Sequence, residues 1–209
     1  MPRRRTLCGR CTRPLPACLC RWVCPTANRL PLLLLMHPLE ANHAKNSATL
    51  LKLSLSQCRV EVGDAFDDNR LQHTLASGAL LLYPSGVGNP AAPPPPHVEQ
   101  VEQVEQLVLL DGTWRQTRRL LHRHPLLQAL PRWALPTVPL PPPPSRYAMR
   151  KAARPDQRST LEAACLALAH LEQRPAHYDA LLQAFAEWAA RWGADWGAER
   201  VADRSVITR

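Results

Sequence analysis

The sequence predicts an α/β fold, with a mostly parallel sheet flanked by helices and a small cysteine-rich metal-binding head at the N-terminus. Short apolar runs at 31–36 (PLLLLM), 79–83 (ALLLY) and 107–110 (LVLL) are bounded by turn residues, as buried strands are. Stretches with helical character separate these runs, and alternating strands and helices favour a parallel sheet. Four closely spaced cysteines precede the first run, in a segment without a core of its own.

The first half of the chain alternates regularly. The strand at 31–36 ends at His37-Pro38, and we expect a helix at 42–57, a second strand at 58–62 (CRVEV) and a helical stretch at 66–75. The strand at 79–83 ends at Pro84-Ser85-Gly86. Residues 86–96 are too rich in proline and glycine for regular structure, the PPPP runs at 93–96 and 141–144 predict polyproline II spacers, and the VEQ repeat at 98–106 predicts a short helical connector.

The stretch LLDGTWRQTRRLL (109–121) carries a buried strand into a helix. Asp111-Gly112 therefore lies at the carboxyl end of the strand, where ligands bind in open α/β sheets. A strand at 132–138 and helices at 159–172 and 176–196 complete the expected elements. Trp188, Trp192 and Trp196 recur every four residues on the last helix, which indicates core or a docking surface.

Composition narrows the function classes. The 209 residues, 45% of them hydrophobic, suffice for one core. The 26 Lys+Arg against 17 Asp+Glu give a net charge of +9, which predicts a polyanionic partner such as nucleic acid, although abundant arginine can equally reflect the base composition of the gene. No apolar segment is long enough for export or a membrane span, so we expect a cytoplasmic protein. Dinucleotide-binding, Walker and serine-hydrolase motifs are absent from the sequence.

The N-terminal segment CGRCTRPLPACLC spaces Cys8, Cys11, Cys18 and Cys20 as C-x2-C-x6-C-x-C. Two close pairs of thiolates can surround one tetrahedral zinc or iron ion, and Cys24 can replace one ligand. A redox C-x-x-C pair is the weaker alternative, because no strand precedes it and no helix follows. We expect residues 1–25 to form this zinc-binding head, residues 26–209 the α/β domain, and the cysteines at 58 and 165 to be core residues.

The helix after Thr113 carries a basic face, with positions i, i+3, i+4, i+7 and i+8 filled by Arg115, Arg118, Arg119, His122 and Arg123. No acidic residue lies between Trp114 and Pro155, so phosphate contact is favoured over a merely solvated face.

A second candidate region runs from Ser145 to Glu162. Ser159 and Glu162 match a capping box, and the free N–H groups of such a helix start also receive carboxylates or phosphates. Upstream hydroxyls and positive charges, among them Tyr147, Arg150 and Lys151, are typical of a loop that contacts a ligand.

Six ordered motifs resemble the DTW-domain family of tRNA-uridine aminocarboxypropyltransferases. They are the cysteine segment, HPLE (37–40), YPS (83–85), DGTW (111–114), YAMRK (147–151) and STLEA (159–163). The resemblance extends from residue 8 to residue 163 and departs from the family pattern at NHAKNSA (42–48), so no contact is assigned to Lys45, Asn46 or Ser47.

The resemblance implies transfer of a 3-amino-3-carboxypropyl group from S-adenosylmethionine to N3 of a tRNA uridine, with release of 5′-methylthioadenosine. It also implies kinship to SPOUT-like α/β folds, whose C-terminal knot builds the cofactor pocket. The partners would be tRNA and S-adenosylmethionine, with a structural Zn²⁺. The alternatives are a SPOUT-like RNA methyltransferase and a non-catalytic zinc-containing RNA-binding protein.

The resemblance and the residue patterns together assign the site. Asp111 is the candidate general base, or a group that orients the uracil or binds the ligand ammonium; Trp114 is a stacking platform or core; Thr113 is catalytic or a helix N-cap. The expected cofactor-binding residues are Tyr83, Pro84, Ser85, Gly112, Tyr147, Ser159, Thr160 and Glu162. The expected RNA-binding residues are Arg115, Arg118, Arg119, Arg123, Arg150 and Lys151, and the expected metal ligands are Cys8, Cys11, Cys18 and Cys20.

Overall fold

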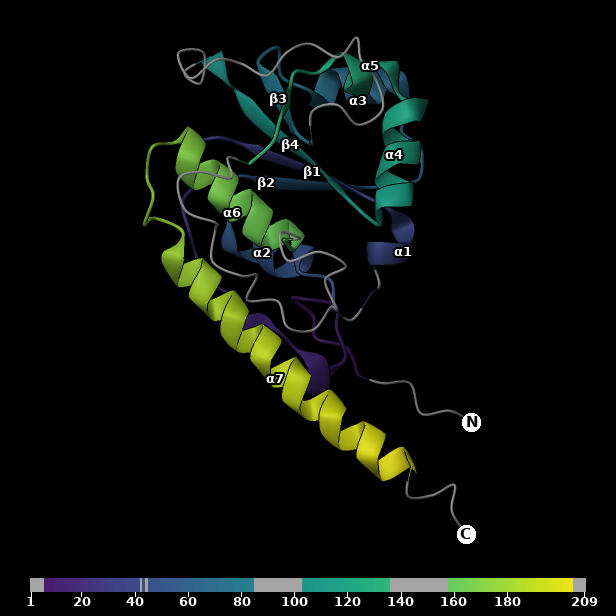
Figure 1. The fold of residues 1–209 in the computed structure, drawn as a ribbon, viewed down its shortest axis with the longest axis vertical. Helices are drawn as coiled ribbons and strands as arrows, with labels where there is room; N and C mark the ends of the chain where they lie inside the picture. Colours follow the sequence, from purple (N-terminus) through teal and green to yellow (C-terminus); the bar gives the residue numbers. More distant parts are fainter. Residues whose placement is uncertain (1–5, 42, 44, 85–102, 136–157, 205–209) are drawn as a thin grey trace.

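The computed structural model describes residues 6–41, 43, 45–84, 103–135 and 158–204, with side chains as far as residue 191. A five-stranded sheet, in the order β2-β1-β4-β3-β5, lies between two layers of helices (Figure 1). All four strand pairings are parallel, which confirms the predicted α/β class.

Three strands, β1, β3 and β4, coincide with the apolar runs of the sequence, and β2 coincides with the predicted strand at 58–62. The strands are β1 (Leu32–Met36), β2 (Cys58–Val62), β3 (Ala79–Leu82), β4 (Gln106–Asp111) and β5 (Arg132–Trp133). The internal strand β1, between β2 and β4, is buried along its whole length, because helices cover both faces of the sheet. Met36 is in register with both Val62 and Asp111, so β1, β2 and β4 end at the same edge.

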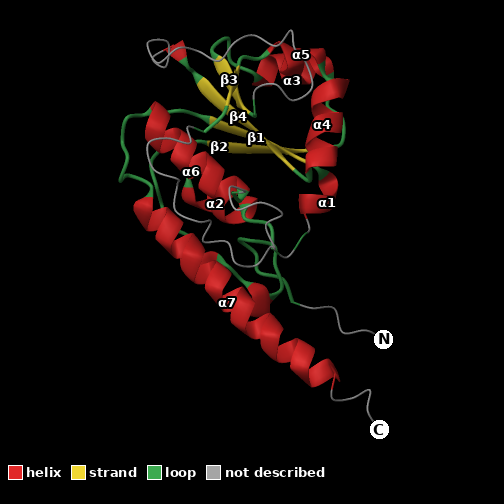
Figure 2. Cartoon of the chain, in the orientation of Figure 1, coloured by secondary structure: helices red, strands yellow, loops and turns green. Residues whose placement is uncertain are grey.

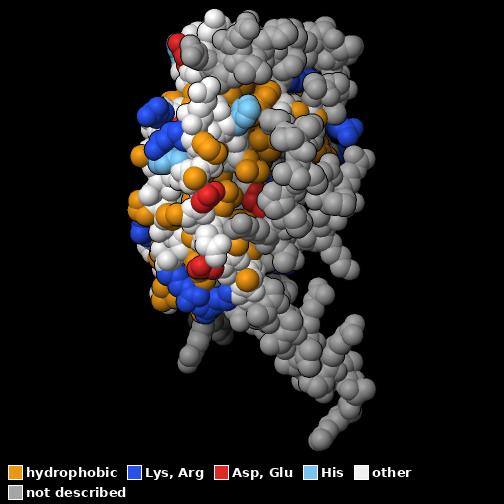
Figure 3. Space-filling view, turned by 60° about the vertical axis from the view of Figure 1, so that its left-hand side comes forward, with side chains coloured by type: hydrophobic (Ala, Val, Ile, Leu, Met, Phe, Trp, Pro, Cys, Tyr) orange, Lys and Arg blue, Asp and Glu red, His pale blue; other side chains and the backbone are white. Residues whose placement is uncertain are grey.

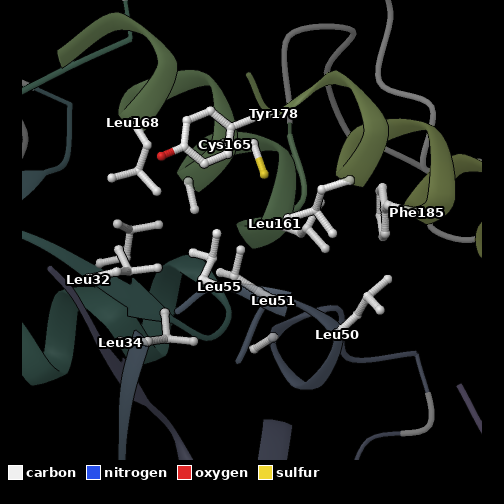
Figure 4. Packing of buried hydrophobic residues seen from close by; sticks show 14 of the residues in the cluster. Leu32, Leu34, Leu50, Leu51, Leu55, Leu161, Cys165, Leu168, Tyr178 and Phe185 are labelled. Carbon is white, nitrogen blue, oxygen red and sulfur yellow. The ribbon is translucent and has the colours of Figure 1, made fainter. Parts of the chain in front are cut away.

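The alternation of side chains along the strands divides the core into two layers. Leu33, Leu35 and Val108 face α3 (Asp68–Thr74), α4 (Trp114–Arg123) and α5 (Pro125–Ala129). Leu32 and Leu34 face the opposite layer, where α2 (Ala48–Ser54), α6 (Thr160–Leu171) and α7 (Asp179–Arg204) lie (Figures 1 and 2). Figure 4 shows this second layer, in which aliphatic side chains from β1, α2 and α6 meet Tyr178 and Phe185.

The predicted helix at 42–57 is wrong at its start. The helix α2 begins only at Ala48, because the backbone before it makes turns, with N–H···O bonds from His43 to Glu40 and from Asn46 to His43. The side chain of Asn46 then accepts a hydrogen bond from the Ala48 N–H at 2.7 Å. The sequence pattern alone does not distinguish these turns from helix.

Several smaller boundaries also differ from the prediction. The short helices α1 (Pro38–Ala41) and α5 were not expected, and β5 is a strand only at Arg132–Trp133. Residues 104–105 of the VEQ repeat are not helical, and Gln106 begins β4. The proline runs and the rest of this repeat up to residue 102 lie outside the described residues.

The cysteine-rich segment lies beside α7 (Figure 1). It contains the short 3-10 helices η1 (Leu15–Ala17) and η2 (Cys20–Trp22). Cys11 and Leu19 are almost fully buried in the α2–α6–α7 layer of the core. A domain division at residue 25 stays a prediction.

Other expectations have clear outcomes. Trp188 and Cys165 are fully buried, as expected of core residues, whereas Cys58 is half-buried on an edge strand. The side chains of Trp192 and Trp196, and the segment at 136–157 between β5 and α6, lie outside the described residues. Kinship to SPOUT-like folds and the presence of a C-terminal knot stay predictions. None of the described helices is both long and apolar enough to cross a membrane.

Candidate functional site

Two predicted site residues lie at the carboxyl edge of the sheet, where Tyr83 follows β3 and Asp111 ends β4. His37, which was not predicted as a site residue, follows β1 at the same edge. The peptide N–H of His37 donates to the Asp111 carbonyl at 2.9 Å, which ties the ends of the two neighbouring strands together. This is the edge at which open parallel sheets bind ligands.

Asp111 is 9% exposed, and its carboxylate joins three elements. Oδ2 accepts from Asn46 Nδ2 at 2.9 Å, just before α2, and Oδ1 accepts from Thr160 Oγ1 at 2.5 Å, in the first turn of α6. A buried carboxylate is expensive unless its oxygens are hydrogen bonded, and these two donors supply that compensation. Asp111 is therefore held in one orientation at the strand end.

In the turn after Asp111, Gly112 lies close to the side chains of Gln116 and His37. A Cβ on Gly112 would lie 3.2 Å from the Gln116 side chain and 3.4 Å from His37 Cβ, so the absence of a side chain lets the helix start against β1. Thr113 is the N-cap of α4 and forms a capping box with Gln116. The N-cap alternative for Thr113 is thus confirmed, and its catalytic role stays a prediction.

Trp114 is not a core residue. Its side chain is 47% exposed, and its ring meets the buried ring of Tyr83 edge-on, with centroids 5.7 Å apart. The Tyr83 hydroxyl has no hydrogen-bond partner among the described residues. The arrangement leaves indole surface open to a planar ligand at the same edge of the sheet as Asp111.

The first turn of α6 forms the predicted capping box. Ser159 accepts from the Glu162 N–H, and the buried Glu162 carboxylate accepts from the Ser159 N–H and hydroxyl, both at 2.9 Å. Thr160, by contrast, turns its hydroxyl to Asp111. This contact brings the two candidate regions of the sequence, around Asp111 and around Ser159, into one site.

Sequence reasoning missed two residues of this network. Asn46 had no contact assigned, yet it is 5% exposed and bonded to Asp111. The buried Arg13 donates to the carbonyl of Asn46 at 2.5 Å. An Asn immediately before a helix is a signal for a local cap, but its partner 65 residues away carries no local signal.

The basic face of α4 is exposed at all five predicted positions. Arg123 differs from the others, because it donates to the Asp64 carbonyl at 3.1 Å and lies 4.0 Å from the Asp64 carboxylate. On the molecular face in Figure 3, Lys and Arg side chains gather in separate groups, and acidic side chains lie between the upper and the lower group. The remaining predicted ligand contacts lie outside the described residues; they are Ser85, Tyr147, Arg150 and Lys151.

The four predicted metal ligands come together. The sulfur atoms of Cys8, Cys11, Cys18 and Cys20 all lie within 4.8 Å of one another, with 3.7 Å between Cys8 and Cys20 and 3.8 Å between Cys11 and Cys18. Zn–S bonds of about 2.3 Å in a tetrahedron place sulfur atoms about 3.8 Å apart. The cluster fits one such ion, and Cys24 is not part of it within the described chain.

The thiols of this cluster differ in acidity. Backbone N–H groups of Cys11 and Arg10 donate to the Cys8 sulfur and lower its pKa to about 6, whereas desolvation raises the pKa of Cys20 to about 12. Close thiols resist joint ionisation, and a bound cation would remove that resistance.

The fold and this geometry define an α/β protein with a buried polar cluster at the carboxyl edge of its sheet and a separate cluster of four cysteines. The chain belongs to the DTW domain family, whose pattern matches residues 5–192. It is 34% identical over 183 residues to the tRNA-uridine aminocarboxypropyltransferase 2 of Drosophila melanogaster, which covers 83% of this chain and 70% of the relative.

Mammalian proteins of the same name are also similar. The mouse protein is 28% identical over 193 residues and the Macaca fascicularis protein 30% over 190 residues, covering 86% and 87% of this chain. The chain spans 61% of the length of each. No solved structure shows significant similarity to the chain.

Proposed function

We propose that this protein transfers a 3-amino-3-carboxypropyl group from S-adenosylmethionine to N3 of a uridine in tRNA, releasing 5′-methylthioadenosine. The support is family membership across residues 5–192 and relatives named for aminocarboxypropyl transfer to tRNA uridine. The observation that carries the proposal is the buried Asp111 at the carboxyl edge of the sheet, whose carboxylate accepts hydrogen bonds from Asn46 and Thr160 and lies near the exposed Trp114 at the start of α4.

The reaction sets the demands on the site. N3 of the uracil attacks the carbon of the amino-acid arm that is bonded to sulfur. The bond between this carbon and sulfur breaks, its electron pair stays on sulfur, and the product 5′-methylthioadenosine is a neutral thioether. The N3 proton must leave, and the correct one of the three sulfonium carbons must face the nucleophile. A fixed acceptor and a fixed binding surface for the two ligands meet these demands.

Asp111 is the proposed acceptor. Its orientation is set by Asn46 and Thr160, so the carboxylate needs no reorganisation when the uracil or the ligand ammonium arrives. In either role the carboxylate faces a group that carries a proton or positive charge. Loss of Asp111 should therefore abolish transfer while leaving the sheet intact.

Trp114 and the first turn of α6 are proposed to hold the ligands. The open indole surface of Trp114 can stack on uracil or adenine, a contact of about 1–3 kcal/mol. The start of α6 presents the N–H groups of a twelve-residue helix, which suit the carboxylate or ribose of S-adenosylmethionine. Gly112, Tyr83 and Pro84 line the neighbouring strand ends in this proposal.

The basic face of α4 is proposed to contact tRNA phosphates. α4 begins directly after the Asp111 turn, so RNA bound along it would bring a uridine to the site. The cysteine cluster would hold structural zinc, which supplies folding energy to a segment with few apolar residues. Seven free thiols and a tRNA substrate support a cytoplasmic location as part of the proposal.

The test uses purified protein, unmodified tRNA and S-adenosylmethionine labelled either in the methyl group or in the carboxyl carbon. We expect carboxyl label, and no methyl label, in uridine after digestion, and no transfer by Asp111→Ala protein that still binds tRNA. Methyl label in the RNA would assign the chain to the methyltransferases. Binding of tRNA without transfer of either label would support the non-catalytic zinc-containing RNA-binding protein instead.

A further inference from the structure

Arg13 lies between the two cysteine pairs and is part of the turn that brings them together. The N–H of Cys8 donates to the Arg13 carbonyl at 2.7 Å, and Leu7 and Pro14 form an antiparallel bridge beside it. The side chain is only 8% exposed, although arginine is rarely buried without specific partners. Its backbone position is thus set by the cysteine turn and its side chain by the protein interior.

Two contacts of the Arg13 side chain reach beyond the cysteine turn, one to Asn46 and one to α7. A terminal guanidinium nitrogen donates to the Asn46 carbonyl at 2.5 Å, and the guanidinium carbon lies 5.3 Å from the centre of the Trp188 ring. The guanidinium lies over a fully buried indole, and this contact restricts it, so its donor points in a defined direction.

The side-chain amide of Asn46 makes two hydrogen bonds with different roles. Nδ2 donates to Asp111 Oδ2 at 2.9 Å, and Oδ1 accepts from the N–H of Ala48, which begins α2. A displaced Asn46 peptide therefore disturbs both the orientation of the Asp111 carboxylate and the first turn of α2. One hydrogen bond from Arg13 fixes this peptide.

We propose that Arg13 is a positioning residue that couples the fold of the cysteine turn to the orientation of Asp111, by way of Asn46. Its effect on transfer rests on the proposed function, whereas its effect on local order does not. The cysteine cluster thereby does more than stabilise its own segment, because its integrity sets the geometry of a site on another element.

The test compares Arg13→Lys with a matched Arg10→Lys control. Arg10 lies in the same turn, but its side chain is exposed, so its replacement leaves the contact to Asn46 intact. Lysine at position 13 keeps the charge and loses the planar donor fork. We expect normal metal content in both variants, with faster amide hydrogen exchange at residues 46–51 and about a tenfold lower kcat/KM only in Arg13→Lys.

A double-mutant cycle with Asn46→Ala separates positioning from general structural support. If Arg13 acts through the Asn46 side chain, Arg13→Lys should add less than a twofold loss in kcat/KM to Asn46→Ala. The proposal is overturned if the losses in kcat/KM of the two single variants multiply in the double variant. It is also overturned if amide hydrogen exchange at residues 46–51 in Arg13→Lys equals that of the wild type, or if exchange becomes faster evenly over the whole chain. If the wild-type protein transfers no label, the proposed function fails, and the exchange comparison still decides the role of Arg13.

Discussion

Replacing Thr160 by Val tests how far the orientation of Asp111 controls transfer. The substitution keeps the shape of the side chain but removes the hydroxyl that donates to Asp111 Oδ1 at 2.5 Å. Ser159, not Thr160, is the N-cap of α6, so the helix keeps its capping box. The change therefore affects one hydrogen bond to the carboxylate.

The expected size follows from that bond. A hydrogen bond to a charged group contributes about 1.5–3 kcal/mol. If the orientation that this bond gives to the carboxylate stabilises the transition state by that full amount relative to the free enzyme, its loss lowers kcat/KM by about 10- to 150-fold. Thr117→Val is the matched control, because it removes a buried hydroxyl that donates to the Trp114 carbonyl and makes no bond to Asp111.

The assay follows carboxyl label into tRNA, with the midpoint of thermal unfolding measured in parallel. We predict a large loss of transfer in Thr160→Val and a small one in Thr117→Val. Wild-type kcat/KM in folded Thr160→Val protein would refute the reasoning that the hydroxyl orients a catalytically important carboxylate.

Three further predictions concern the RNA surface, the metal and the core. Arg119→Gln should weaken tRNA binding and reduce the slope of log affinity against log salt concentration by the share of about one phosphate contact, measured by titration at several salt concentrations. Arg123→Gln should have a smaller effect on both quantities, because Arg123 already contacts Asp64. Cys18→Ser should lose the metal and Cys24→Ser should retain it, which elemental analysis would measure. Because Cys20, with a pKa of about 12, must release its proton when the metal binds, the metal affinity of the wild-type protein should rise between pH 6 and pH 8. Glu172→Ala leaves the N–H groups of Arg29 and Leu30 without their buried acceptor, so it should cost about 1–3 kcal/mol of unfolding free energy in denaturant titration; an unchanged midpoint would contradict that role.

The sequence pattern predicts the sheet well because its strands are buried on both faces. Continuous apolar runs such as 32–36 and 107–110 have no other stable place in a protein of this size, and their parallel pairing follows from the helices between them. Capping boxes at Thr113 and Ser159 are local as well, since each is formed by residues three apart.

The contacts that complete the site are not local. Asn46, Asp111 and Thr160 meet only because β4, α2 and α6 are adjacent in space, and no periodicity in the chain encodes their hydrogen bonds. Arg123 has no acidic neighbour in sequence, yet Asp64 reaches it from the loop after β2. Residue type and strand-end position thus predict where the site lies, while tertiary packing determines which side chains share a bond.

The most direct test of the central claim is to measure both products of a single reaction of the wild-type protein with S-adenosylmethionine and unmodified tRNA. Chromatography with mass detection would quantify the adenosine-containing product and the modified nucleoside. We predict 5′-methylthioadenosine in equal amount to a uridine bearing the 3-amino-3-carboxypropyl group. Formation of S-adenosylhomocysteine together with a methylated nucleoside would contradict the proposal.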